Sequence, residues 1–562
     1  MLRLAPFLAI LVLAGPVLAG LAGTIGPAVG HLPALGYRGF DRAPLDALLA
    51  TPGLLTMCCL SFATGLLATA LSLLIATLFT AGWQGTRAFA ALQRALSPLL
   101  AVPHAAAAFG LAFLIAPSGW LVRLASPALT GWDRPPDALI VNDPLGLSLL
   151  AGLVVKEMPF LFLMILAALP QADGASRTRL AASLGYGRVR GYLLTVFPSV
   201  YAQIRLAVLA TLAFSASVVD MAIVLGPSTP PTLAVRIVEW ASDPDLALRR
   251  VAACGALLQV AVVLLAMALW YGGERITRRI GRRMIAGGRR GRGWGAMLSR
   301  RAGPVLAGLC TLAVGLGLAV LALWSVAGPW RFPEAWPRAV SLASWQRALP
   351  GALDAGATTL WLGAASGLAA LVLALLVLEN ETRRGGRTGW GQGAMLLIYL
   401  PLLVPQVSLV FGLDTFFLSL GASATPPALL LAHLTFVAPY VFLSLGHPWR
   451  AFDERYVTAA RLLGVTPNGA FWRVRLPMLL RPVLTALALG FAVSAALYLP
   501  TLLVGAGRYP TLTTEAVALA SGGNRRLIGV WAILQMALPA IVFAVALAVP
   551  ALAFRDRRGL AA

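Results

Sequence analysis

Long apolar blocks recur along the whole chain, each long enough to form a helix that crosses a membrane. About 20 apolar residues in a helix span a hydrocarbon layer of about 30 Å. The blocks fall near 7–29, 53–81, 95–117, 145–169, 203–225 and 250–271, and then near 304–327, 353–378, 394–420, 427–446, 484–505 and 527–553. This pattern predicts an all-α integral membrane protein with about 12 transmembrane helices, arranged as two groups of six.

The composition excludes a large soluble enzyme and changes the interpretation of the charge. Of 562 residues, 59% are hydrophobic and 12% are charged, whereas a soluble domain carries about 25% charged residues. The net charge of +23 would suggest nucleic acid in a soluble protein. Here the arginines lie between apolar blocks, so we expect anionic membrane lipid and no nucleic acid as the partner.

An arginine-rich segment at 272–303 separates the two groups of spans. Its charge places it in the cytoplasm, and its glycines predict a mobile connector between a first half at 1–271 and a second half at 304–562. An even number of spans then puts both termini in the cytoplasm. The first block could be a cleaved signal peptide, but 304–327 occupies the same place in the second half, which favours a retained helix.

Short matches in the same order relate the two halves. The first-half segments are Val102-Pro103 with Phe109-Gly110-Leu111, Pro159-Phe160-Leu161-Phe162, Pro231-Thr232-Leu233 and Ala241-Ser242; the second-half segments are Val404-Pro405 with Phe411-Gly412-Leu413, Pro439-Tyr440-Val441-Phe442, Pro510-Thr511-Leu512 and Ala520-Ser521. Six spans per half make this a parallel repeat, and a translocation path is expected where the halves meet, near the membrane midplane.

Two loops stand out, one after the fourth span of each half; we call 179–198 the first elbow and 458–477 the second elbow. Gly185 precedes Pro198 by 13 residues, and Gly464 precedes Pro477 by the same number. Each glycine is expected to take a positive φ that ends a short helix, near 454–463 in the second elbow, and each proline to start the next helix.

The composition of the elbows suggests a docking surface. The second elbow combines apolar residues with the basic residues Arg461, Arg473 and Arg475, and the first combines leucines and tyrosines with Arg188 and Arg190. A matched pair on one face suits docking to a soluble partner. The simpler alternative is a pair of interfacial helices anchored by arginine.

The second elbow resembles the signature loop of bacterial ATP-binding-cassette importer permeases. The resemblance rests on Ala459-Ala460, Gly464, Val474 and Leu476-Pro477, while the segments 217–235 and 505–519 resemble fused permeases of the thiamine and ferric-iron transport type. It implies a periplasmic substrate-binding protein and two ATPase subunits that contact the elbows. The implied contact residues are Ala181, Gly185, Pro198, Ala459, Ala460, Gly464, Leu476 and Pro477. Thr458 and Arg179 replace the glutamate that heads the family loop, so the two elbows could dock unequally.

The chain itself is not expected to be an enzyme or to carry a cofactor. Lys156 is the only lysine and follows Val155, so no phosphate-binding Gly-x4-Gly-Lys loop exists and ATP must be hydrolysed by another subunit. The histidines at 31, 104, 433 and 447 are far apart in the sequence, and the four cysteines lie in apolar blocks, so no metal site is expected. A secondary transporter driven by an ion gradient is the alternative function, because parallel repeats also occur in that class.

Ionisable residues within predicted spans are candidates for the path, because charges in a membrane are costly and often functional. The charged candidates are Lys156, Glu157, Asp220 and Asp414, and the polar ones at similar depth are His104, Gln406 and His433. Our hypothesis is that Asp220 and Asp414 face the path and attract a cation. The alternative is that Asp220 pairs with Lys156 for structural reasons. Glu379 is expected at the membrane surface.

Overall fold

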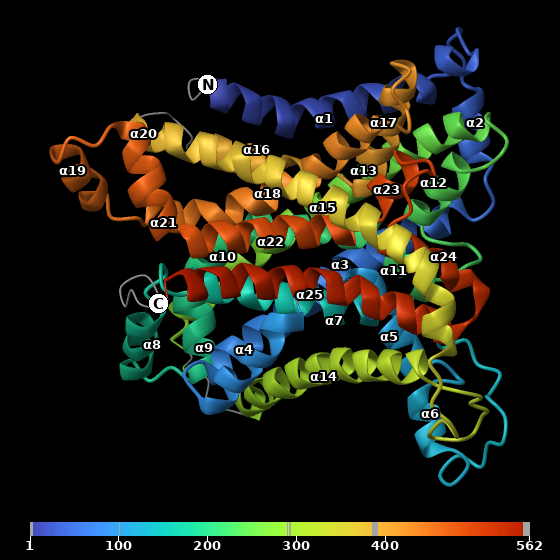
Figure 1. Cartoon of the computed structure of the whole chain (residues 1–562). Helices are drawn as coiled ribbons and strands as arrows, with labels where there is room; N and C mark the ends of the chain where they lie inside the picture. Colours follow the sequence, from blue (N-terminus) through green and yellow to red (C-terminus); the bar gives the residue numbers. More distant parts are fainter. Residues whose placement is uncertain (1–3, 100–101, 289, 291–293, 385–391, 555–562) are drawn as a thin grey trace.

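A computed structural model shows a long helical bundle (Figure 1) and describes all residues except 1–3, 100–101, 289, 291–293, 385–391 and 555–562. In the first half the helices are α1 (Ala5–Ala28), α2 (Ala43–Leu49), α3 (Leu54–Trp83), α4 (Arg87–Leu99), α5 (His104–Ile115), α6 (Trp120–Ala125), α7 (Leu147–Ala168), α8 (Gly174–Ser183), α9 (Arg188–Gly191), α10 (Phe197–Ser217), α11 (Asp220–Leu225), α12 (Leu233–Ala241) and α13 (Leu248–Ala286). A 3₁₀ turn, Pro33–Leu35, and a π-helical turn, Tyr192–Val196, complete this half.

The second half repeats this order. Its helices are α14 (Trp294–Ser325), α15 (Ala343–Arg383), α16 (Gln392–Leu403), α17 (Gln406–Ser419), α18 (Pro426–Arg450), α19 (Arg455–Leu462), α20 (Pro467–Ala470), α21 (Leu476–Met478), α22 (Leu480–Ala496), α23 (Leu499–Leu503), α24 (Leu512–Ala518) and α25 (Arg525–Ala553). A π-helical turn, Phe471–Arg475, and a 3₁₀ turn, Leu519–Gly522, complete it.

The spans confirm the predicted all-α membrane protein. Among the described residues, 10 helices are long and apolar enough to cross a membrane, and a bent pair, Pro467–Met478 with Leu480–Ala496, raises the number to 11. The shorter apolar helix Gln406–Ser419 marks one more of the predicted blocks. The helices α1, α3, α7, α18 and α25 start and end within a few residues of the predicted blocks, whereas α13, α14 and α15 each extend ten or more residues beyond one end.

The third and fifth spans are broken in both halves; Pro103 and Pro405 mark the break of the third span in the sequence, whereas the apolar pattern does not mark that of the fifth. In the third span, α5 begins directly after Pro103 and α17 directly after Pro405, because proline fixes an extended backbone and lacks the N–H that a continuous helix requires. In the fifth span, α10 ends at Ser217 and α22 ends at Ala496. The short helices α11 and α23 follow these breaks, so the repeat extends to the interruptions.

Each first span packs against the opposite half. The helix α1 lies along α17, and α14 lies along α5 and α3. Glycines permit the close approach: a Cβ atom on Gly412 would lie 1.9 Å from the carbonyl oxygen of Gly20, and one on Gly110 would lie 2.9 Å from the backbone of Gly317. The repeated Phe-Gly-Leu segments therefore mark two equivalent helix crossings.

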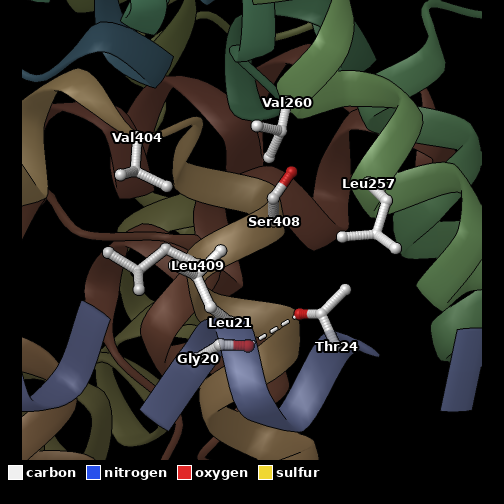
Figure 2. Close-up of a pocket in the computed structure, with 8 residues that line it drawn as sticks. All are labelled: Gly20, Leu21, Thr24, Leu257, Val260, Val404, Ser408 and Leu409. Carbon is white, nitrogen blue, oxygen red and sulfur yellow. Dashed lines mark hydrogen bonds between the residues drawn. The ribbon is translucent and has the colours of Figure 1, made fainter. Parts of the chain in front are cut away.

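Figure 2 shows the α1–α17 crossing with α13 beside it. Thr24 donates its hydroxyl hydrogen to the carbonyl oxygen of Gly20 at 2.8 Å, and Ser408 donates to that of Ala256 at 2.8 Å. The cavity among these helices measures about 10 Å³, about enough for one water. The crossing is thus a packed joint between the halves, too small to admit a solute.

Another repeated motif ties a short helix to a second span. The backbone N–H of Leu233 donates to the hydroxyl of Ser61 at 3.1 Å, and the N–H of Leu512 donates to that of Thr359 at 3.0 Å. These N–H groups begin α12 and α24 and have no partner within their own helices. The Pro-Thr-Leu repeat therefore corresponds to the same joint in each half.

The predicted mobile connector at 272–303 is wrong over most of its length. The helix α13 continues to Ala286 and α14 begins at Trp294, so much of the segment extends the two spans. Glu274 explains the continuation, because its carboxylate binds Arg205 at 2.9 Å and the hydroxyl of Tyr201 at 2.5 Å on α10. These bonds hold the helix against the bundle despite its glycines.

Candidate functional site

The two elbows lie at one end of the bundle, together with the start of α1 and the end of α25 (Figure 1). The opposite end carries α2, α6, α12 and α24. A shared end is what two sites on one soluble assembly would require. It also agrees with the even number of spans expected in each half.

Both elbows close their first helix in the same way. Gly185 has φ +82° and Gly464 has φ +84°, as the sequence predicted. In the second elbow the N–H of Gly464 donates to the carbonyl of Arg461 at 3.0 Å, and the N–H of Val465 donates to that of Ala460 at 3.1 Å. In the first elbow the N–H of Gly185 donates to the carbonyl of Ala182 at 2.9 Å, and the N–H of Tyr186 donates to that of Ala181 at 3.0 Å.

This is a Schellman ending, in which a glycine of positive φ satisfies the last carbonyls of a helix. The carbonyl that accepts the bond from the residue after the glycine belongs to an alanine in both elbows, Ala181 and Ala460. Pro198 and Pro477 each lie in the first turn of the next helix, also as predicted. The backbone geometry of the elbows therefore follows from their sequence spacing.

A π-helical turn in each elbow was not predicted. It spans Tyr192–Val196 in the first and Phe471–Arg475 in the second, at equivalent positions before the proline. A π turn inserts one residue into a helix and is often found at functional sites. No residue type marks it in a single sequence, so only the structure could reveal it.

The surfaces of the elbows differ in exposure. Leu462 and Leu463 are each 84% exposed, Trp472 is 65% exposed, and α19 contains no buried residue. In the first elbow Ala181 and Tyr192 are buried, and Leu180 and Leu184 are exposed. Large apolar side chains exposed in clusters mark interaction surfaces.

The basic face predicted for the second elbow is partly wrong, because Arg475 is buried. Its guanidinium binds Glu379 and Glu454, and it lies over the rings of Trp449 and Phe452 at 5.6 Å and 5.5 Å. Glu379, four residues before the end of α15, is also buried within the protein, where it pairs with Arg475 and with Arg383 at 2.7 Å. These groups anchor the elbow to the membrane helices.

Four of the predicted intramembrane residues form one cluster, in which Lys156, Glu157 and Asp220 are buried and His104 is partly exposed. His104 and Glu157 form an ion pair at 3.2 Å, and Lys156 interacts electrostatically with Glu157 and Asp220. Asp220 also interacts with His104. Lys156 therefore lies near enough to both carboxylates to interact with them electrostatically, which is consistent with the structural alternative.

The second half contributes two tyrosines to this cluster that the sequence did not single out. Tyr440 on α18 interacts electrostatically with Glu157, and Tyr498 at the start of α23 interacts with Asp220. The cluster therefore spans the boundary between the halves. Tyr440 stands where the first half has Phe160, so the difference within the repeat was the available signal.

The remaining predicted residues lie apart from the cluster or at its edge. Asp414 is 2% exposed and pairs with Arg249 at 2.5 Å, which links α17 to α13. Gln406 is the first residue of α17, just as His104 is the first residue of α5. His433 is fully buried and bonds to the hydroxyls of Ser494 at 2.9 Å and Thr501 at 3.0 Å.

Comparison with known proteins gives the family. Residues 387–556 match the family described as "Binding-protein-dependent transport system inner membrane component". The inner membrane ABC transporter permease protein YnjC of Escherichia coli (strain K12) is 34% identical over 506 residues, which are 89% of this chain and 89% of that protein.

Shorter matches involve permeases named for polyamines. The spermidine/putrescine transport system permease protein PotC of Haemophilus influenzae is 30% identical over 98 residues, which are 17% of this chain and 38% of that protein. The putrescine transport system permease protein PotI of Escherichia coli (strain K12) is 28% identical over 148 residues, 25% of this chain and 52% of that protein. The chain belongs to the family of inner membrane permeases of ATP-binding-cassette importers.

Proposed function

We propose that the two elbows are the sites at which a pair of separate ATPase subunits, one per elbow, drives this permease. The observation that carries the proposal is the matched geometry of the elbows. The positive φ of Gly185 and Gly464, the Schellman endings and the π turns recur at equivalent positions at one end of the bundle. Two identical ATPase subunits would need two docking sites of the same geometry.

The exposed leucines give these sites a chemistry for docking. Leu462 and Leu463 are exposed on the second elbow, and Leu180 and Leu184 on the first. Burying a leucine stabilises a complex by about 1.5–3 kcal/mol relative to leaving it exposed. These leucines lie beside predicted contact residues. Leu180 and Leu184 precede Ala181 and Gly185, and Leu463 precedes Gly464.

We place the elbows and both termini in the cytoplasm and the opposite end outside the inner membrane. The arginines of α13 beyond the apolar stretch lie at the elbow end, in agreement with the excess of basic residues on cytoplasmic loops. A substrate-binding protein would then dock on the periplasmic end, near α12 and α24. Its participation agrees with the description of the matched family.

The path is proposed to pass the cluster of His104, Lys156, Glu157 and Asp220. Residues from both halves meet there, and two carboxylates with two tyrosines suit a cationic solute. Gln406 occupies in the second half the position that His104 occupies in the first, so we include it among the residues of the path. We leave Asp414 out, because its carboxylate is occupied by Arg249.

The cargo is therefore proposed to be a small cation. The polyamine names belong to relatives that match only part of this chain. A thiamine-like cation and ferric iron, which the resemblance of the sequence suggested, carry positive charge too. Binding of these candidates to the partner binding protein would identify the cargo, since fold alone does not.

Crosslinking tests the elbows directly. In a variant with its four native cysteines replaced, Leu184→Cys or Leu463→Cys should crosslink to the ATPase subunits, and nucleotide should change the yield. Leu129→Cys is the matched control, because Leu129 is 86% exposed and follows α6, which lies at the other end, by four residues. Absence of crosslinks at both elbows in an active complex would refute the proposal, and transport in liposomes by the chain alone along an ion gradient would favour a secondary transporter.

The path has a separate test. Asp220→Asn should lower transport of the cation by at least about tenfold while ATPase binding is unchanged, because a neutral amide attracts a cation less. Ser408→Ala, at the packed crossing, is the control. If Asp220→Asn instead removes folded protein from the membrane, the carboxylate serves packing and not the path.

A further inference from the structure

Two adjacent arginines begin the last span of each half, at equivalent positions. Arg249 and Arg250 lie at the start of α13, and Arg525 and Arg526 lie at the start of α25. A glutamine ten residues after the first arginine fixes the equivalence. Gln259 donates to the carbonyl of Ala216 at 2.9 Å, whereas Gln535 donates to the hydroxyl of Thr513 at 2.7 Å, which in turn donates to the carbonyl of Ala495.

The first-half pair is neutralised within the chain. Arg249 binds the carboxylate of Asp414 at 2.5 Å, and Arg250 binds that of Asp41 at 3.2 Å. Arg250 also lies 3.7 Å from the ring centroid of Tyr37. Each of the two guanidinium groups therefore has its own counter-ion.

The second-half pair has no such carboxylate. Among the described residues, none lies within 4.0 Å of the guanidinium of Arg525 or Arg526. The position equivalent to Asp414 is Ala112, by the same offset that relates Gly110 to Gly412. The repeat thus keeps the two cations and omits the anion.

A third arginine adds to this excess of positive charge. Arg123 is 4% exposed and donates to the carbonyl oxygens of Ser118 at 3.0 Å, Arg331 at 2.9 Å and Glu334 at 3.2 Å. The carboxylate of Glu334 is bound by Arg338. Arg525 donates to the carbonyl of the same Ser118 at 2.9 Å and to its hydroxyl at 2.6 Å.

A cavity of about 310 Å³ opens among these groups, lined by Ser118, Arg123, Trp324, Gly523, Asn524, Arg525 and Arg526. One water needs about 10–15 Å³ by the same measure, so the cavity has room for a much larger group. The N-terminus of the 29-residue helix α25 also lies here and favours negative charge. Three guanidinium groups around one hollow are costly without an anion.

We propose that this cavity binds a phosphate group. Guanidinium groups match phosphate oxygens in paired hydrogen bonds, and the cavity exceeds what a single carboxylate would fill. It lies where α6, the end of α14 and the start of α25 meet, at the end opposite the elbows (Figure 1). The proposal does not depend on the ATPase docking proposed above.

The surroundings favour the head group of an anionic phospholipid as the source of this phosphate. Two pairs of tryptophan rings pack near the cavity. The ring centroids of Trp324 and Trp330 are 4.4 Å apart, and those of Trp120 and Trp336 are 5.4 Å apart. Tryptophan gathers at the membrane–water interface, where lipid phosphates lie. A soluble phosphate is the other source that the same chemistry would accept.

The test uses the full-length purified protein after removal of lipid. Binding of phosphatidylglycerol, phosphatidylcholine and inorganic phosphate is measured by native mass spectrometry and by thermal stabilisation. Arg526→Gln removes one guanidinium of the cavity, and Arg508→Gln removes an exposed arginine of the loop before α24 as a matched control. Ala112→Asp adds the carboxylate that the other half has.

We expect Arg526→Gln to weaken phosphatidylglycerol binding about tenfold, as loss of a charge-assisted hydrogen bond implies, and Arg508→Gln to leave it unchanged. Ala112→Asp should also weaken it by supplying an internal anion. Strong competition by inorganic phosphate would support the site with a soluble source, and its failure would support the lipid source. Wild-type binding of both ligands in Arg526→Gln and in Ala112→Asp would overturn the proposal.

Discussion

The two elbows have the same backbone geometry but are anchored by different contacts. In the first, the linker packs against the turn: Arg290 accepts a hydrogen bond from the N–H of Gly187 at 3.1 Å, and its side chain lies 3.2 Å from where a Cβ of Gly185 would be. In the second, no atom of the described residues lies within 4 Å of that position on Gly464, and the buried Arg475 with its two glutamates anchors the elbow.

This difference shows that the repeat conserves the backbone geometry of the elbow, whereas the contacts that anchor the elbow to the membrane helices differ between the halves. The residue equivalent to Arg475 in the first elbow is Val196, which is fully buried in the apolar core. One elbow is therefore held by packing and by the linker, and the other by an ion-pair network. The second elbow has the freer surface, so we expect it to contribute more to docking.

The largest loss of stability should come from removing the ion pairs that anchor the second elbow. Arg475→Ala leaves the buried Glu379 with Arg383 alone and removes the partner of Glu454, so it should lower the free energy of unfolding by about 3 kcal/mol, the lower end of the cost of breaking a buried ion pair. Arg473→Ala, which changes an exposed arginine two residues earlier, should change it by less than about 0.5 kcal/mol. Thermal unfolding in detergent measures both, and equal stability of the two variants would contradict anchoring by these ion pairs.

A smaller effect should follow from changing the docking surface alone. Leu462→Asp with Leu463→Asp should weaken ATPase binding by about 2–3 kcal/mol, because the exposed leucines can no longer be buried. Leu180→Asp with Leu184→Asp on the first elbow should weaken it less. Affinity of the purified permease for the ATPase measures the difference, and equal losses would mean that the elbows dock equally.

The glycines should give a still smaller and nearly symmetric loss. Gly185→Ala and Gly464→Ala each place a side chain at positive φ, which costs about 1–2 kcal/mol. The Gly185 variant must also displace the flexible Arg290 side chain, so its loss should be slightly greater. Unfolding and transport-coupled ATP hydrolysis measure the effect; a stable, fully coupled Gly464→Ala would show that the Schellman ending is dispensable.

The smallest effect distinguishes the starts of the two fourth spans. Asp143 accepts hydrogen bonds from the N–H groups of Leu147 at 2.7 Å and Ser148 at 2.8 Å, whereas the cap residue of α18, Thr425, makes no such bond. Burial alone would raise the pKa of Asp143, but these bonds and the Ser148 hydroxyl outweigh it and lower the pKa below 3.8. Asp143→Ala should therefore cost about 1 kcal/mol at neutral pH.

The pH dependence gives this last prediction its sign. A lowered pKa in the folded state means that the carboxylate stabilises the fold above its ordinary pKa, and that this contribution is lost as the pH falls through the folded value. The difference between wild type and Asp143→Ala should vanish in that acid range. A difference that is constant from pH 7 down to pH 3 would show that the carboxylate charge is irrelevant, and Thr425→Ala should show little effect at either pH.

Local rules explain why so much of the site was predictable. The Schellman endings need only a glycine and a helix before it, and the proline starts need only a fixed φ, so the chain near Gly464 and Pro477 determines them. The helix crossings needed more. The Phe-Gly-Leu repeat was visible in the sequence, but nothing local states that Gly412 meets Gly20 of the other half.

The charged residues were the least predictable, because burial and pairing depend on residues distant in the chain. Arg475 and Glu379 are 96 residues apart; Arg475 was expected on an exposed basic face and Glu379 at the membrane surface, and their pairing was not predicted. Asp414 was assigned to the path and is paired with Arg249, 165 residues away. Sequence showed that charges entered the membrane region but not which charges would meet.

The sequence by itself determined the helical membrane class, the twofold repeat, the position of the elbows and the absence of a nucleotide-binding loop, because each depends on hydrophobic length, order or local backbone geometry. Only the tertiary structure decided which first span packs on which half, where the fifth span of each half breaks, and which arginines have no carboxylate of the described residues within 4.0 Å. Those outcomes depend on contacts between segments far apart in the chain, and a one-dimensional pattern contains no distances between them.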